Sequence, residues 1–117
     1  VRSKPAGGTR MTAWLYLSAA IAMEIAGTFL LKLSDGFAKW QWGALSLCCY
    51  AVSFLFLAPA LKLLPVGIVY AIWSGVGIIG VTALGIAVFG DRLALAQYGF
   101  IAMILVGTVG LKLTTPG

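Results

Sequence analysis

The chain has 117 residues, of which 62% are hydrophobic and only 9% are charged, and its mean hydropathy is +1.05. Soluble domains carry about 25% charged residues, so this composition excludes an ordinary water-soluble enzyme and predicts an integral membrane protein. The formal net charge is +5, but the basic residues are scattered at the ends of apolar stretches, which argues against a nucleic-acid partner.

Four apolar stretches follow one another along the chain, at residues 12–31, 43–64, 66–89 and 93–113. Each has about the 20 residues that a helix needs to cross about 30 Å of hydrocarbon. Residues 1–10 lack apolar periodicity and are expected to be a disordered extension, whereas residues 11–117 are expected to form a four-helix transmembrane domain. The predicted fold is all-α and multi-pass, with short links and antiparallel neighbouring helices.

Charges at the predicted helix ends bear on the orientation in the membrane. With four spans, Lys62 and Lys112 flank one side, whereas Lys32, Lys39 and Arg92 flank the other. This balance is a weak orientation signal, so both orientations could insert and two copies could meet head to tail. Counting the basic residues of the N-terminal extension reverses the bias.

Glu24 is the only acidic residue inside any of the apolar stretches, and it lies near the middle of the first one. A carboxylate at that depth costs on the order of 3 kcal/mol, which makes it a functional candidate. No basic residue lies near the middle of any stretch to neutralise it. A second copy of the chain would supply eight helices in total and place two Glu24 side chains near a shared central site.

Small residues flank Glu24 on its own helix. Ala20 and Gly27 share its face at helical spacing, with Leu17, Thr28 and Leu31. Because Ala20 and Gly27 have almost no side chain, we expect them to leave an opening beside the carboxylate.

Aromatic and hydroxyl side chains share faces of the next two helices. Tyr50, Ser53 and Phe54 lie on the second, and Tyr70 and Trp73 lie on the third. A carboxylate with several aromatic rings suits a lipophilic or aromatic cation, because each ring face contributes about 0.5–2 kcal/mol when desolvated. The alternative is that the rings are packing or interfacial residues and that the serine bonds only to backbone carbonyls.

The same Glu24 carboxylate can also carry a proton. Because a proton and a cation exclude each other at one carboxylate, their exchange is coupled, and that is the minimal mechanism of an antiporter. Such a protein needs no cofactor and is not an enzyme. A metal site is not expected either, because the chain has no His and its two cysteines, Cys48 and Cys49, are adjacent and point apart on a helix.

Glycines mark the third and fourth helices. Gly75 and Gly77 are candidates for a hinge, although they could instead permit tight helix contact. Gly99 and Gly107 lie among bulky aliphatic residues on a helix that has no charge in its middle. That helix is expected to be a packing or dimerisation surface.

Several segments together resemble the small multidrug resistance family, and especially its quaternary-ammonium branch. They are the Glu24–Thr28 segment EIAGT, the Lys32–Phe37 segment KLSDGF, the Leu64–Gly77 segment LPVGIVYAIWSGVG and the Phe89–Leu93 segment FGDRL. The resemblance implies a bacterial inner-membrane antiporter that works as an antiparallel dimer and exports cationic drugs in exchange for protons.

The resemblance also implies roles for individual residues. Glu24 would bind both the proton and the substrate, and Tyr70 and Trp73 would contact the substrate and gate access. Tyr50 and Ser53 would line the second-helix wall, Gly75 and Gly77 would form the kink, and Trp14 would be an aromatic residue of the binding chamber.

Two features depart from the quaternary-ammonium pattern. Phe100 stands where a dimerisation glycine is expected, and the Gly107–Leu113 ending also resembles the guanidinium-exporting branch. That branch, however, has a Trp three residues after the central Glu, where this chain has Gly27. The alternatives are therefore a guanidinium or polyamine exporter of the same family, or one subunit of a heterodimeric pair.

Overall fold

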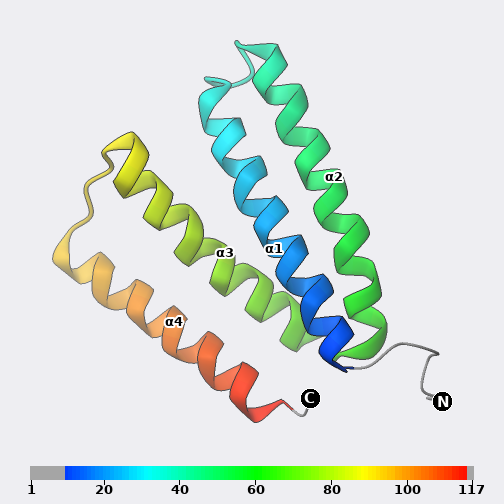
Figure 1. Ribbon diagram of the computed structural model, residues 1–117. Helices are drawn as coiled ribbons and strands as arrows, with labels where there is room; N and C mark the ends of the chain where they lie inside the picture. Colours follow the sequence, from blue (N-terminus) through cyan, green and yellow to red (C-terminus); the bar gives the residue numbers. More distant parts are fainter. Residues whose placement is uncertain (1–9, 116–117) are drawn as a thin grey trace.

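Four helices account for nearly all of residues 10–115, which the computed structural model describes (Figure 1). They are α1 (Arg10–Leu33), α2 (Trp40–Leu63), α3 (Val66–Phe89) and α4 (Leu95–Thr114). Each begins and ends within one helical turn of the stretch predicted from the sequence, and all four are long and apolar enough to span a membrane. The predicted all-α, four-span fold is confirmed. The extension expected at residues 1–10 lies outside the described residues, except that Arg10 begins α1.

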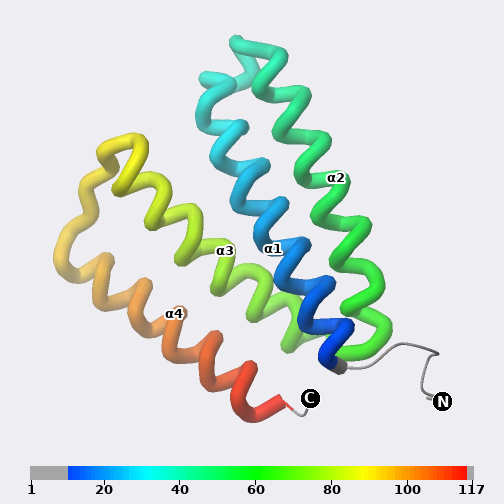
Figure 2. Tube along the Cα trace, viewed as in Figure 1, coloured from blue at the N-terminus to red at the C-terminus, as the bar shows by residue number. Residues whose placement is uncertain are grey.

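The helices are arranged as an antiparallel hairpin of α1 and α2, followed by α3 and then α4 (Figure 2). The α3 helix lies against α1 and α4 and only sparsely against α2, and among the described helices the backbone of α4 lies beside α3 alone. We call the end that holds the α1–α2 and α3–α4 links the loop end. The opposite end, with the start of α1, the α2–α3 link and the end of α4, is the terminus end.

A seam of small residues joins α1 to α2. The Ser46 hydroxyl donates to the Gly27 carbonyl oxygen at 2.6 Å, and the Ser53 hydroxyl donates to the Ala20 carbonyl oxygen at 2.7 Å. Both serines are buried, and each hydrogen bond crosses from one helix to the backbone of the other. Small residues let the two backbones approach, and polar groups then bond across the contact. Along the seam they recur every seven residues, at positions 13, 20 and 27 of α1 and 46, 53 and 60 of α2.

The largest group of buried apolar side chains lies at the terminus end. We call it the terminal core: Ala13, Trp14, Leu17, Ile21, Ala60, Leu64, Val69 and Ile72. These side chains come from the first half of α1, the last turn of α2 with the residue that follows it, and the first half of α3. The terminal core therefore holds three helices together at one end of the molecule.

Two glycines of α3 allow it to contact the two neighbouring helices, α4 and α1, closely. A Cβ added at Gly75 would collide with the Thr108 hydroxyl of α4, and one added at Gly77 would collide with the Glu24 carboxylate of α1. Residues two apart on a helix point about 200° from each other, so these glycines serve opposite contacts. Both are buried within a continuous helix, as expected for tight helix contact. Their role as a hinge remains a prediction.

The α1–α2 link is a tight turn at the loop end. Three consecutive residues, Asp35, Gly36 and Phe37, have positive φ values of 53°, 66° and 71°. The Ser34 hydroxyl donates to the Leu31 carbonyl oxygen and accepts the Phe37 backbone N–H. The Phe37 ring covers Gly43, where a Cβ would collide with it. The link therefore folds back onto the start of α2.

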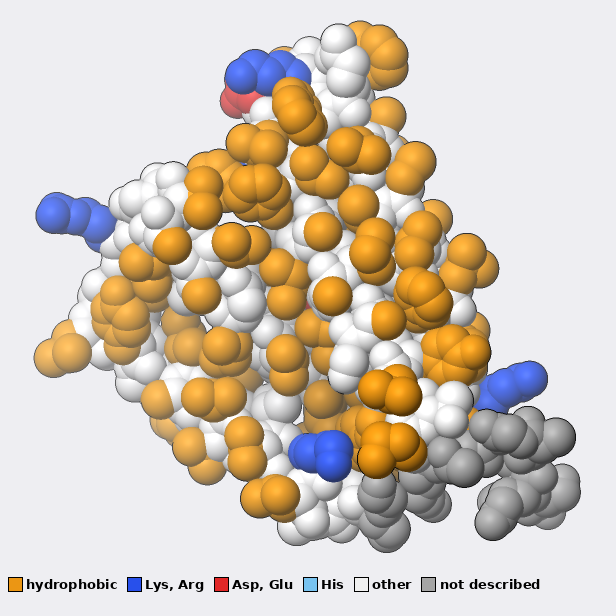
Figure 3. Space-filling view, viewed as in Figure 1, with side chains coloured by type: hydrophobic (Ala, Val, Ile, Leu, Met, Phe, Trp, Pro, Cys, Tyr) orange, Lys and Arg blue, Asp and Glu red, His pale blue; other side chains and the backbone are white. Residues whose placement is uncertain are grey.

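Apolar side chains cover most of the face seen in Figure 3, and basic side chains appear at its edges. On α4 only Thr108 is buried, and the remaining residues of this helix are exposed or partly exposed. An apolar exterior with peripheral charges is the surface expected of a protein that lies in lipid.

Gly75→Ala should destabilise the contact between α3 and α4. The new methyl group meets the buried Thr108 side chain, and overpacking of this kind costs about 1–3 kcal/mol. The thermal unfolding midpoint in detergent should fall. Gly67→Ala is the matched control on α3, because nothing lies within 4 Å of its added Cβ and the substitution improves helix propensity. Equal midpoints for the two variants would contradict this packing.

Candidate functional site

The Glu24 side chain extends from the middle of α1 to the backbone of α3. The position that a Cβ would take at Gly77 lies 2.8 Å from Glu24 Oε2 and 2.9 Å from its Cδ. Only a glycine leaves room for the carboxylate here. Within residues 10–115, the other oxygen, Oε1, is buried and has no hydrogen-bond partner.

A buried carboxylate oxygen without a partner is costly, because a desolvated acceptor loses its bonds to water and gains none in return. A bound proton removes the negative charge, and a bound organic cation pairs with it. The Glu24 site is therefore chemically suited to either occupant.

Three aromatic rings form a group on α2 and α3. The Trp73 ring centroid lies 5.6 Å from that of Tyr70 and 6.4 Å from that of Phe54, both in tilted arrangements. On α3, Trp73 precedes Gly77 by about one helical turn and Tyr70 precedes it by about two, so the group lies toward the terminus end from the point where Glu24 meets α3. Tyr70 is 62% exposed and Phe54 is 56% exposed, so the aromatic group opens onto the surface of the chain.

Tyr50 and Ser53 of α2 both contact α1. The Tyr50 hydroxyl is hydrogen-bonded to the Thr28 hydroxyl, and Thr28 lies one turn beyond Glu24. Ser53 is fully buried in the seam, where its hydroxyl bonds to α1 backbone rather than lining an open wall.

The opening expected beside Ala20 and Gly27 is absent from the described structure. Both residues are buried, and a Cβ at Gly27 would lie 3.3 Å from the Tyr50 ring and 3.3 Å from the Ser46 carbonyl oxygen. The prediction was wrong because the small side chains serve the approach of α2 and not a ligand. The Glu24 carboxylate itself lies against α3, in the room that Gly77 leaves.

Trp14 lies away from Glu24, toward the terminus end. Its ring is only 8% exposed within the terminal core, and its indole nitrogen Nε1 has no hydrogen-bond partner in the described part of the chain. The Lys112 Nζ atom of α4 lies 4.6 Å from the centroid of this ring. Trp73 also packs against the terminal core that contains Trp14, although no ring–ring contact between the two is seen within residues 10–115.

The remaining candidates lie on exposed surfaces. No other segment of residues 10–115 comes within 4 Å of a Cβ added at Gly99 or Gly107 of α4, and the role of these glycines in dimerisation remains a prediction. Cys48 and Cys49 are free thiols. Over residues 10–115, His, Cys, Asp and Glu side chains form no cluster that could hold a metal ion.

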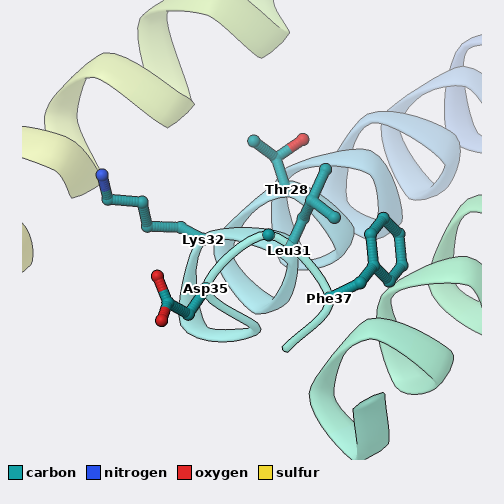
Figure 4. Close-up of a pocket in the computed structure, with 6 residues that line it drawn as sticks. Thr28, Leu31, Lys32, Asp35 and Phe37 are labelled. Atoms are coloured by element: carbon teal, nitrogen blue, oxygen red, sulfur yellow. The ribbon is translucent and has the colours of Figure 1, made fainter. Parts of the chain in front are cut away.

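A hollow of 570 Å³ lies at the loop end, where α1 meets the α1–α2 link (Figure 4). Its lining residues are Thr28, Leu31, Lys32, Asp35, Gly36 and Phe37. Thr28 connects the hollow to the Tyr50 hydroxyl and lies one turn from Glu24.

Sequence reasoning missed three contacts between helices. It did not pair Thr28 with Tyr50, Gly75 with Thr108, or Lys112 with Trp14. The seven-residue spacing of small residues in the first two stretches could have predicted the α1–α2 register and the burial of Ser53. No local signal identifies Thr108 as the partner of Gly75.

Fold and site together define a small multi-pass membrane protein with one buried carboxylate in its helix bundle. The family model described as "Small Multidrug Resistance protein" matches residues 12–114. The chain belongs to the small multidrug resistance family.

Three relatives illustrate the range of the family. The multidrug transporter EmrE of Escherichia coli is 40% identical over 103 residues, covering 88% of this chain and 94% of the relative. A guanidinium exporter of Yersinia pseudotuberculosis is 38% identical over 103 residues, covering 88% of this chain and 99% of the relative. The nicotine metabolites export pump subunit NepB of Paenarthrobacter nicotinovorans is 37% identical over 106 residues, which are 91% of this chain but only 64% of NepB.

Gly77→Ala should displace the Glu24 carboxylate and weaken the binding of an aromatic cation such as tetraphenylphosphonium. A tenfold loss of affinity, about 1.4 kcal/mol, is expected from calorimetric titration. Gly80→Ala is the matched control: its added Cβ meets the flexible Cδ1 methyl of Ile25 rather than the carboxylate. If both variants bind the cation as tightly as the native chain, Gly77 does not set the position of Glu24.

Proposed function

We propose that the chain is a proton-coupled antiporter that exports lipophilic and quaternary ammonium cations across the bacterial inner membrane. Family membership makes it an efflux transporter, and its relatives include a multidrug transporter and a guanidinium exporter. The observation that carries the proposal is the buried, unpartnered Oε1 atom of Glu24. A proton and a cargo cation would compete for that carboxylate, and this competition couples their movements.

The aromatic group supports a lipophilic cargo. The rings of Tyr70, Trp73 and Phe54 present faces that attract cations and aromatic groups, and they do so with little demand on shape. Because Tyr70 and Phe54 are largely exposed, a cargo can reach these rings from the surface of the chain. We therefore expect the chain to bind cations of many different shapes.

We place the active unit in an antiparallel homodimer with both Glu24 carboxylates near its centre. The α4 helix supports this arrangement, because among the described helices its backbone lies beside α3 alone and most of its apolar surface is left uncovered. Gly99 and Gly107 on that surface allow close approach of another helix. The heterodimeric alternative draws support from NepB, which is named a subunit of a pump.

The quaternary-ammonium substrate class is favoured over guanidinium by the packing of Gly27. A Cβ at this position already approaches Tyr50 and Ser46 to 3.3 Å, so the indole of a Trp does not fit between α1 and α2 in this arrangement. The Trp that the guanidinium-exporting branch has at this position is therefore incompatible with the packing of α1 on α2. Export of guanidinium or polyamines is the second candidate, since the chain is 38% identical to a guanidinium exporter.

Glu24→Gln should abolish cation binding and proton release together. The amide keeps nearly the same shape but can neither carry the negative charge nor bind and lose a proton. Calorimetry with tetraphenylphosphonium and pH recording in weak buffer test both effects. Asp91→Asn is the control, since it removes a carboxylate in the exposed α3–α4 link and should leave both properties unchanged. Undiminished cation binding by Glu24→Gln would contradict the shared site.

The substrate class can be tested by resistance assays in a sensitive bacterial host. The chain should raise tolerance to ethidium and methyl viologen, because these aromatic cations match the ring group around Trp73. The Glu24→Gln variant, expressed at the same level, provides the background. Tolerance to guanidinium without tolerance to ethidium would instead assign the chain to the guanidinium exporters.

A further inference from the structure

Two lysines, one near each end of the helix bundle, lie over aromatic rings of another helix. At the terminus end, Lys112 in the last turn of α4 places its Nζ atom 4.6 Å from the ring centroid of Trp14 on α1. At the loop end, Lys32 in the last turn of α1 places its Nζ atom 5.8 Å from the ring centroid of Phe89 on α3. Both distances fall within the range of cation–π attraction, and the first is much the closer.

The two ends of the bundle also differ in packing, and the shorter lysine contact lies at the more tightly packed end. The terminal core fills the terminus end, and Leu111, the neighbour of Lys112, packs against it. At the loop end the 570 Å³ hollow beside Lys32 lies between α1 and the α1–α2 link (Figure 4), and α1 meets α3 there through the Phe29 and Phe89 rings, whose centroids are 5.5 Å apart. In Figure 1, α1 and α3 lie close together at the terminus end and draw apart toward the loop end. The shorter lysine contact thus accompanies the closed end, and the longer one accompanies the open end.

Lys112 also ties together helices that lack a backbone contact. Among the described helices the backbone of α4 lies beside α3 alone, so the Lys112–Trp14 contact is a side-chain bridge from α4 to α1. Trp14 is nearly buried, which strengthens the attraction, whereas Lys112 is exposed and its flexible stem allows the ammonium to leave for water. Such a contact can hold the terminus end closed and can also break to let that end open.

We propose that Lys112–Trp14 and Lys32–Phe89 are opposed latches that position the helices during alternating access. In the arrangement described, the Lys112–Trp14 latch is engaged and keeps the terminus end shut. Opening that end separates α4 from α1 and lets α1 approach the end of α3, which tightens the Lys32–Phe89 contact. This inference rests on the proposed transport function, but it names the residues that set which end is open.

The test measures access of water to each end without any substrate. The chain carries Cys48→Ser and Cys49→Ser, together with one reporter thiol made by either Leu17→Cys in the terminal core or Leu31→Cys in the hollow. The rate of reaction with a methanethiosulfonate reagent reports the exposure of each thiol in nanodiscs. Lys112→Met removes the charge but retains the apolar stem, and Lys32→Met makes the same change at the other end.

Lys112→Met should speed the reaction of the thiol at position 17 by at least about threefold and slow that of the thiol at position 31. The reason is that this variant removes the cation–π attraction at the terminus end and leaves the one at the loop end in place. Lys32→Met should shift both rates in the opposite directions. Lys112→Arg keeps a cation over the ring and should restore near-native rates.

Unchanged rates in Lys112→Met would overturn the proposal. So would rates that move in the same direction at both positions, or a failure of Lys112→Arg to restore them, since general loosening explains those results. Failure of the proposed function is a separate result. It would appear in the native chain as cation binding without proton release, whatever the thiol rates.

Discussion

The uncompensated burial of one carboxylate oxygen is the constraint on which the rest of the structure depends. Glu24 Oε1 is enclosed between α1 and α3 and has no partner among the described residues. A chain that keeps such a group in its membrane-spanning part must supply a proton or a cation from outside the protein. Gly77 holds the carboxylate in place because any larger residue would occupy its position.

Small residues determine how closely the helices approach this carboxylate. Ser46 and Ser53 bond directly to the backbone of α1, and their spacing aligns α2 with the face that contains Gly27. This rigid hairpin contrasts with α4, which is seated on α3 through Thr108 and is otherwise largely uncovered. The bundle therefore combines a closely packed pair of helices with a less covered one, which is the arrangement that the proposed transport by helix movement would use.

The sequence was sufficient to predict the four helices and the importance of Glu24, because hydropathy and a buried charge are local signals. The sequence was misleading at Ala20 and Gly27. Their small side chains were predicted to leave space for a ligand, but they allow α2 to pack closely against α1. The seven-residue spacing would have revealed that seam. The pairing of Gly75 with Thr108 was beyond prediction, because it depends on the depth at which α3 and α4 meet. The dimer and the hinge remain predictions for the same reason: each depends on an arrangement of helices that no local pattern specifies.

Family membership and the position of Glu24 lead to one central claim, that a proton and a cargo cation compete for a single carboxylate. The most direct measurement is proton release from the purified native chain when tetraphenylphosphonium is added in weakly buffered solution below the pH at which Glu24 loses its proton. Release should rise with added cation and saturate together with binding, and the affinity should fall as the pH is lowered. Saturable binding with no proton release at any pH would contradict the claim.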